Sequence, residues 1–265
     1  MLSTPKTGYS PLVYDLGSIP HPSQLFPAFQ DMPNPALLDS AMPGASGNRF
    51  SYLTADPFLV IRSRGRLISL EHDGTCEEVE GDPWSTLQGL LRKYHTEQVL
   101  GLPSFQGGAL GYWGYDLGRH LERLPSWTDD DLQLPEMYLG LYDWALAYDS
   151  DTGRTCLFST GLPEGTVERA QIRAEEIMER LKKGPQDARP SAFDSPVSLQ
   201  SNFTPETYMA AIERIKEYLA AGDTYQVNLS QRFQSPFQGD PWDLYLRLRS
   251  FNPAPFAAYL GFPEV

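Results

Sequence analysis

Cysteine is nearly absent from this chain: Cys76 and Cys156 are the only two among 265 residues. Neither belongs to a CxxC pair or to the spacing of a zinc site. Two cysteines in a chain of this length do not form a disulfide framework. We therefore expect two inert thiols in a reducing compartment, which predicts a cytoplasmic protein.

Basic residues are also scarce, since 21 Lys and Arg face 34 Asp and Glu, for a net charge of −13. A surface this acidic repels phosphate backbones and anionic lipids, which argues against nucleic-acid and membrane-surface binding. No apolar run approaches the ~20 residues of a membrane span. The N-terminal stretch MLSTPKTGYSPLVYDLG lacks the basic and apolar regions of a signal peptide. The sequence thus predicts a soluble protein.

Common catalytic motifs are missing as well. The four histidines are scattered: His21, His72, His95 and His120. None pairs with another at metal-ligand spacing. GALGYWG, at 108–114, is not the dinucleotide fingerprint, and there is no nucleophile elbow or P-loop. The run Asp129–Asp131 is typical of a solvated turn.

Short apolar runs separated by Pro and Gly predict strands in the first part of the chain. They lie at 36–39, 50–55, 58–63 and 66–70. An aromatic-rich strand is expected over 137–149, followed by a turn at 149–153 and a strand at 155–159. Helical spacing and caps predict helices that open at Asp82, cover 163–183, run from Thr204 to Gly222, and cover 241–250. This pattern indicates an α+β fold with antiparallel sheets.

The segment 184–201 is rich in Pro and Ser and has no periodicity. We interpret it as a linker between a first region, 1–183, and a second region, 202–265.

One stretch of the second region, GDTYQVNLSQRF at 222–233, alternates strictly between apolar and polar residues. The polar positions are Gln226, Asn228, Ser230 and Arg232. A strand with this pattern buries one face, and its other face either meets water or lines a polar cavity. The alternation alone leaves both possibilities open.

Three motifs carry a resemblance to a known family. They are FQGGALGYWGYDLGRHLERLP at 105–125, LPEMYLGLYDWALAYD at 134–149, and the stretch 222–233. The chain resembles the chorismate-utilising family of anthranilate synthase component I, isochorismate synthase and aminodeoxychorismate synthase component I, the last group above all. The resemblance covers Leu12 to Val265 and only the N-terminal portion of the family. It implies antiparallel sheets stacked as a sandwich with flanking helices, in which strands from both halves of the chain interleave.

The resemblance also implies an activity. Aminodeoxychorismate synthases replace the 4-hydroxyl of chorismate with an amino group, for para-aminobenzoate and folate synthesis. Ammonia comes from a separate glutamine amidotransferase subunit (component II), and Mg²⁺ binds the carboxylates of chorismate. The family's catalytic lysine, in a Pro-Ile-Lys-Gly-Thr motif, its acid–base glutamate and its Mg²⁺ ligands have no counterpart among these residues. We therefore expect no catalytic residue and no metal ligand in this chain, and no turnover by this chain alone.

In this family the strand that matches 225–233 borders the chorismate cavity, which implies that Gln226 and Asn228 form part of the cavity wall. Isochorismate synthases have a lysine at the position of Gln226, where it activates the attacking water. A neutral amide cannot act as a general base near pH 7, so Gln226 argues against water addition.

Members of the family also bind tryptophan, as a feedback inhibitor or as a structural occupant, in a pocket built by the segments matching 37–40, 47–50 and 252–257. The expected lining residues are Ser40, Gly47, Asn48, Arg49, Phe50, Pro255, Phe256 and Ala257. Anthranilate synthases usually have Glu where this chain has Asp39, a shorter carboxylate for the ammonium of a ligand. The alternative is that these residues simply pack two sheet segments together.

Two other functions stay open. Anthranilate synthase component I is a related member of the family, and its Pro-Ile-x-Gly-Thr motif has Ala in place of Lys. QVNLSQRF and the YDWAL segment favour the aminodeoxychorismate group. The other possibility is a non-catalytic tryptophan-binding or interaction module.

Overall fold

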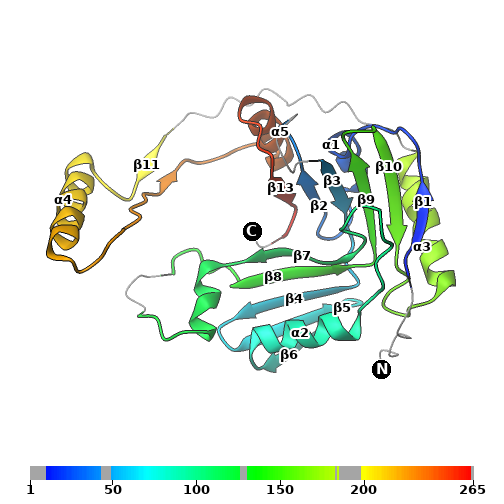
Figure 1. Ribbon diagram of the computed structural model, residues 1–265, viewed down its shortest axis with the longest axis horizontal. Coiled ribbons are helices and arrows are strands. Elements are labelled where there is room, and N and C mark those ends of the chain that lie inside the picture. The colour runs from blue at the N-terminus through cyan, green and yellow to red at the C-terminus, as the bar shows by residue number, and fades with distance from the viewer. Residues whose placement is uncertain (1–9, 43–48, 126–129, 183, 185–197, 264–265) are drawn as a thin grey trace. The chain divides into compact units, whose positions relative to one another are not determined.

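The computed structural model describes residues 10–42, 49–125, 130–182, 184 and 198–263 (Figure 1). These residues form two compact units. The first contains the described residues before 189 together with those from Tyr245 onward, and the second contains the described residues from 198 to Leu244. Most of the expected linker, 184–201, lies outside the described residues, and the division of the chain at that segment stays a prediction.

A six-stranded antiparallel sheet forms one layer of the first unit. In spatial order its strands are β1 (Leu12–Asp15), β10 (Arg154–Ser159), β9 (Trp144–Asp149), β3 (Phe50–Thr54), β2 (Ala36–Asp39) and β13 (Ala257–Leu260). The last strand of the chain thus pairs with β2, and segments from both ends of the chain share one sheet. The expected interleaving of strands is therefore present.

A five-stranded antiparallel sheet forms a second layer. Its order is β6 (Thr75–Glu80), β5 (Leu67–His72), β4 (Leu59–Arg64), β8 (Met137–Tyr142) and β7 (Gly108–Trp113). The α+β class with antiparallel sheets is confirmed, and the strands expected over 36–70 form within a few residues of their predicted bounds.

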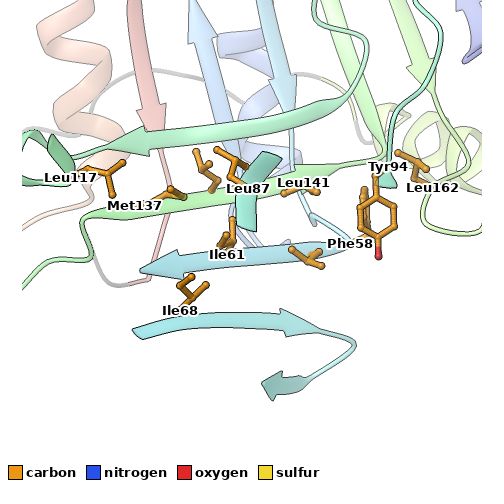
Figure 2. Close-up of a cluster of buried hydrophobic side chains, with 11 residues drawn as sticks. Phe58, Ile61, Ile68, Leu87, Tyr94, Leu117, Met137, Leu141 and Leu162 are labelled. Atoms are coloured by element: carbon orange, nitrogen blue, oxygen red, sulfur yellow. The ribbon is translucent and has the colours of Figure 1, made fainter. Parts of the chain in front are cut away.

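The five-stranded sheet packs against α2 (Pro83–Lys93), which Asp82 caps by accepting a hydrogen bond from the Ser85 amide at 2.9 Å. Figure 2 shows the apolar cluster that joins them, with Leu87 of α2 among side chains of β4, β5 and β8. Ile61, Ile68 and Met137 are completely buried there. Each such side chain contributes roughly 1.5–3 kcal/mol of transfer free energy.

The remaining helices of the six-stranded sheet's layer are α1 (Pro22–Leu25), η1 (Phe26–Phe29), α3 (Val167–Leu181) and α5 (Pro241–Phe251). A further short helix, η2 (Tyr115–His120), follows β7, and its Leu117 is buried in the cluster of the five-stranded sheet. The Phe26 ring of η1 meets the Tyr259 ring of β13 edge-on at 5.2 Å between centroids, and Tyr245 of α5 contacts the same ring at 5.5 Å. η1 and α5 therefore lie on the Tyr259 face of the sheet.

The prediction of a single strand over 137–149 is wrong. The segment forms β8 and β9, which belong to different sheets, and Asp143 lies between them. The chain changes layer there because the Asp143 carbonyl accepts hydrogen bonds from the amide and hydroxyl of Thr160, at 2.7 and 3.0 Å. The Asp143 carboxylate is held by Arg173 of α3, at 3.0 Å.

The second unit contains β11 (Gln200–Ser201), α4 (Pro205–Ala221) and β12 (Phe233–Gln234). The predicted limits of α4 are confirmed: Thr204 is its N-cap, and Gly222 ends it in the left-handed conformation with φ 80°. The expected burial of its apolar stripe is not observed, because none of its residues is buried among those described.

The strand predicted over 225–233 is wrong except at its end. Residues 225–232 have no regular structure, and only β12 pairs, with β11. Tyr225 is 98% exposed and Val227 43% exposed. A strand needs a partner backbone for its amides and carbonyls, and no strand among the described residues pairs with 225–232.

Candidate ligand pocket

Four of the residues expected to form a ligand pocket meet at a cavity of about 490 Å³ in the first unit. Strands β2, β3 and β13 supply most of its wall. The lining residues are Leu38, Asp39, Ser40, Phe50, Tyr52, Ser104, Phe256, Ala257 and Ala258. A volume of this size is typical of small-molecule sites.

Strand register explains why these side chains share one face. Leu38 of β2 stands opposite Tyr52 of β3 on one side and opposite Ala258 of β13 on the other. Because successive residues of a strand point to opposite faces, these three side chains project together. Leu37 and Asp39 project to the other face, where Leu37 stands opposite Tyr259.

The pocket wall is aromatic, with a few hydroxyl groups. The Phe50 and Tyr52 rings lie 6.3 Å apart between centroids, and Phe256 is 75% exposed at the mouth. The hydroxyls of Tyr52 and Ser104 are 3.4 Å apart. Ser40 donates its hydroxyl hydrogen to the Phe50 carbonyl at 2.7 Å, which fixes the end of β2 against β3. The wall can therefore hold a planar ring and offer it hydroxyl partners.

The side chain of Asp39 is engaged away from the pocket, on the α5 side of the sheet. Its Oδ2 accepts hydrogen bonds from Arg249 Nε at 2.5 Å and from the Tyr245 hydroxyl at 2.8 Å. Burial, reinforced by the Asp39 charge, raises the pKa of Tyr245 above its usual range. His21 Nε2 lies 3.8 Å from Asp39 Oδ1, and burial lowers the pKa of His21 to about 4. His21 is therefore neutral at physiological pH.

Four of the expected lining residues are at the pocket: Ser40, Phe50, Phe256 and Ala257.

Arg49 and Pro255 are not among the residues that line it. The Arg49 side chain forms ion pairs with Asp149 at 2.7 Å and Asp151 at 3.3 Å, and its guanidinium lies 4.9 Å from the centre of the Phe50 ring. The Arg49 hydrogen bonds lower the pKa of Asp149 to about 2. Gly47 and Asn48 lie outside the described residues. The tryptophan role of the pocket stays a prediction.

The expected lining residues did not include five that line the cavity: Leu38, Asp39, Tyr52, Ser104 and Ala258. Leu38 and Asp39 belong to the expected segment 37–40, but neither was named as a lining residue. Strand alternation from Ser40 and Phe50 could have found Leu38 and Tyr52. Ser104 belongs to the loop before β7, and no local signal in the sequence places it here.

Gln226 and Asn228 are exposed in the second unit, with Gln226 Nε2 3.4 Å from Asn228 Oδ1. They lie one residue apart on the irregular segment described above, not on a paired strand. Their place in the wall of a chorismate cavity stays a prediction.

A second cavity, of about 430 Å³, lies in the first unit and is lined in part by charged side chains. Arg173 Nη1 binds Asp56 Oδ2 at 2.9 Å, and His72 Nδ1 lies 2.6 Å from the Phe58 carbonyl oxygen. These two side chains therefore have partners within the fold.

Neither a membrane span nor a metal cluster was found in the part of the chain that the structure describes. No helix there is long and apolar enough to cross a membrane. No three His, Cys, Asp or Glu side chains gather there in a way that could hold a metal ion.

Two antiparallel sheets with helices around them, and an aromatic-lined cavity to which β13 contributes, define an α+β protein with a candidate ligand pocket. The family model described as chorismate binding enzyme matches residues 48–265. The chain belongs to the chorismate binding enzyme family, which confirms the resemblance seen in its motifs.

Individual relatives come from both expected groups. Aminodeoxychorismate synthase component 1 of Escherichia coli (strain K12) is 35% identical over 240 residues, which cover 89% of this chain and 49% of the relative. Anthranilate synthase component 1 of Acetivibrio thermocellus is 33% identical over 252 residues, which cover 91% of this chain and 51% of the relative. The crystal structure of anthranilate synthase component I from Streptococcus pneumoniae TIGR4 superimposes with a TM-score of 0.67 at 25% identity, covering 80% of this chain and 48% of that one. The chain thus spans about half the length of the curated relatives it matches.

Proposed function

We propose that this chain is the N-terminal part of an aminodeoxychorismate synthase component I, which aminates chorismate to 4-amino-4-deoxychorismate for para-aminobenzoate and folate synthesis. The observation that carries the proposal is family membership together with 35% identity to the Escherichia coli aminodeoxychorismate synthase over 89% of this chain. The motifs QVNLSQRF and YDWAL add support for this group over its anthranilate relatives.

The chemistry of the proposed reaction is substitution on the chorismate ring. Ammonia, delivered by a glutamine amidotransferase subunit, replaces the 4-hydroxyl, so no water is added to the ring. The neutral amide of Gln226 supports this assignment because it cannot remove a proton from water near pH 7. In the proposal, Gln226 and Asn228 contribute hydrogen-bonding groups to the cavity wall and take no part in proton transfer.

The catalytic lysine and glutamate belong, in this proposal, to the half of the relatives that this chain does not match. Mg²⁺ would offset the negative charge of the substrate carboxylates. The described residues provide no cluster suited to a metal ion, so we assign no Mg²⁺ ligand to them. We place the activity in the cytoplasm, which suits the two free thiols, Cys76 and Cys156.

The test is to isolate the protein from its native cell, determine its intact mass, and incubate it with chorismate, MgCl₂ and ammonium chloride. We expect 4-amino-4-deoxychorismate, identified by mass spectrometry, from a protein heavier than 29.7 kDa. We expect no turnover from the 265-residue chain alone. Omission of ammonium is the control, and it should abolish the product.

Anthranilate synthase component I is the second candidate, and the Acetivibrio thermocellus relative supports it at 33% identity. The same incubation separates the two, because anthranilate is fluorescent and has lost the enolpyruvyl group. Anthranilate as the product would refute the first proposal. Amination by the isolated 265-residue chain would refute the assignment of the catalytic groups to another segment.

The pocket at β2, β3 and β13 supports a further element of the proposal, an aromatic ligand of the tryptophan type. A pocket with this function also fits the non-catalytic alternative, a tryptophan-binding module. The two readings differ in the amination assay, since only the enzyme forms a product.

A further inference from the structure

The cavity of about 430 Å³ contains charged side chains of both signs, which come from different elements. The first turns of α3 supply two arginines, Arg169 and Arg173. The end of β5 and the turn after it supply two carboxylates, Glu71 and Asp73. A ligand in this cavity can therefore meet cations and carboxylates at the same time.

The cations lie deeper than these carboxylates. Arg173 is buried, and the Arg169 side chain is 32% exposed. The side chains of Glu71 and Asp73 are 42% and 85% exposed. The cavity thus has a cationic interior and a carboxylate rim.

Arg169 differs from Arg173 in having an unused donor. Arg173 donates to Asp143 from Nε and to Asp56 from Nη1, at 3.0 and 2.9 Å. Arg169 Nε is buried and has no hydrogen-bond partner among the described residues. Glu164 Oε2 lies 3.7 Å from it, which is too long for a hydrogen bond. A buried donor without an acceptor is unfavourable, and an oxygen atom supplied by a ligand would satisfy it.

The rim carboxylates keep the capacity to accept further hydrogen bonds. Glu71 Oε2 accepts from Arg62 at 2.9 Å, and Asp73 Oδ2 lies 3.1 Å from His72 Nε2. Each carboxylate has lone pairs beyond those that these contacts use, and an ammonium group is the matching donor. A ligand with only a negative charge would be repelled by this rim. A ligand with only a positive charge would leave the Arg169 donor unused.

Strained backbone borders the cavity. Asn34 and Asp56, which both line it, have positive φ values of 45° and 53°. Each precedes a proline, a position that favours an extended conformation instead. The Asp56 amide donates to the Pro33 carbonyl at 2.7 Å, which ties the two loops together. Strain of this kind clusters at ligand sites, and a cavity with fixed walls binds without first being ordered.

Phe58 and Val60 add apolar surface to the same cavity. We propose that it binds a small aliphatic amino acid as the zwitterion. The carboxylate of the ligand accepts from Arg169, and its ammonium group donates to Glu71 and Asp73. Its side chain lies against Phe58 and Val60. This site is separate from the aromatic pocket at β2, β3 and β13, and the proposal does not depend on the amination of chorismate.

The test compares leucine with two analogues that each lack one of its charged groups. 3-Methylbutylamine has no carboxylate, and 4-methylpentanoate has no ammonium group. Isothermal titration of the purified protein at neutral pH should show leucine binding about tenfold more tightly than either analogue, because each lost group removes charge-assisted hydrogen bonds. An analogue that binds as tightly as leucine would overturn the inference, and so would absence of binding by all three. The product of the amination assay is unaffected by either result.

Substitutions show whether leucine occupies this cavity. Arg169→Met removes the unused donor, and Asp73→Asn removes a rim carboxylate at a turn position, φ 47°, that asparagine accepts. Each should weaken leucine binding about tenfold. Lys182→Met is the matched control: it removes a cation at the far end of α3, where 70% of the side chain is exposed, and should leave the affinity within about twofold.

Unchanged affinity in both cavity variants would overturn the inference, because leucine would then bind elsewhere. Should Arg169→Met fail to fold, Asp73→Asn still decides the question, since that side chain is largely exposed.

Discussion

Arg173 is the residue whose removal we expect to have the clearest effect on this fold. Arg173 is 4% exposed, and its Nε donates to Asp143 Oδ2 at 3.0 Å. A second nitrogen, Nη1, binds Asp56 and Glu176, each at 2.9 Å. Asp143 is completely buried and stands between the two sheets, so this ion pair fixes the crossing between them.

Arg173→Met keeps the length of the side chain and removes the charge. Asp143 is then a buried carboxylate without its cation, and breaking a buried pair in this way costs about 3–5 kcal/mol. Burial already raises the pKa of Asp143, against the opposing effect of Arg173. Loss of Arg173 raises that pKa further. The pKa of Asp143 in the folded variant then exceeds its value in the unfolded chain. As the pH falls, the folded variant therefore takes up a proton before the unfolded chain does, and the loss of unfolding free energy caused by the substitution becomes smaller.

Urea unfolding at pH 7.5 and pH 5, followed by tryptophan fluorescence, measures both effects. Trp144 is completely buried next to Asp143 and should report on this region. Arg173→Met should lose about 3–5 kcal/mol at pH 7.5 and clearly less at pH 5. Arg173→Met with Asp143→Asn should recover about 2 kcal/mol of the loss, within the range of coupled neighbours. Arg66→Met is the matched control, because its pair with Glu80, at 3.5 Å, is exposed and should be worth less than about 1 kcal/mol.

A loss below about 1 kcal/mol at pH 7.5 would refute the reasoning, since it lies outside the range for a broken buried pair. A loss that is the same at both pH values would refute the assignment of the effect to an uncompensated Asp143 charge.

The remaining predictions concern acid stability and backbone strain. The pKa of His21 is lowered to about 4 in the fold, against 6.5 for the unfolded residue, so stability should fall by at most roughly 3 kcal/mol as the pH drops from 6.5 to 4. His21→Asn, which preserves a capping acceptor, should flatten that part of the urea-unfolding pH profile, whereas the same substitution at the exposed His95 should not. Gly161→Ala should lower the melting temperature strongly, because an added Cβ would lie 2.2 Å from a backbone oxygen at φ 68°. Gly153→Ala, at φ 67° with open space around it, should cost only about 1 kcal/mol; equal losses at the two glycines would contradict the steric argument.

The elements that sequence predicted well have local causes. The Asp82 and Thr204 caps accept hydrogen bonds from amides three residues ahead, and Gly222 ends α4 in a conformation that favours glycine. Each signal lies within one turn of the feature it specifies. Such features can be predicted because no distant residue is needed to decide them.

The change of sheet at Asp143 has no local cause of this kind. The residues on both sides are buried, aromatic and strand-forming, and neither Gly nor Pro interrupts them at this point. Its partner Arg173 lies 30 residues further along the chain. The failure of the strand at 225–232 is similar, because alternation fixes which face is apolar but not whether another strand is available to pair with it.

The pocket shows what strand alternation adds to a motif. Within Leu37–Ser40, adjacent residues belong to different faces of one strand: Leu38 and Ser40 line the cavity, whereas the Asp39 side chain binds α5. If the whole motif is carried over from the family, all four of its residues are assigned to the ligand pocket. Alternation with a period of two separates them, and the Asp39 side chain contacts Arg249 and Tyr245 of α5.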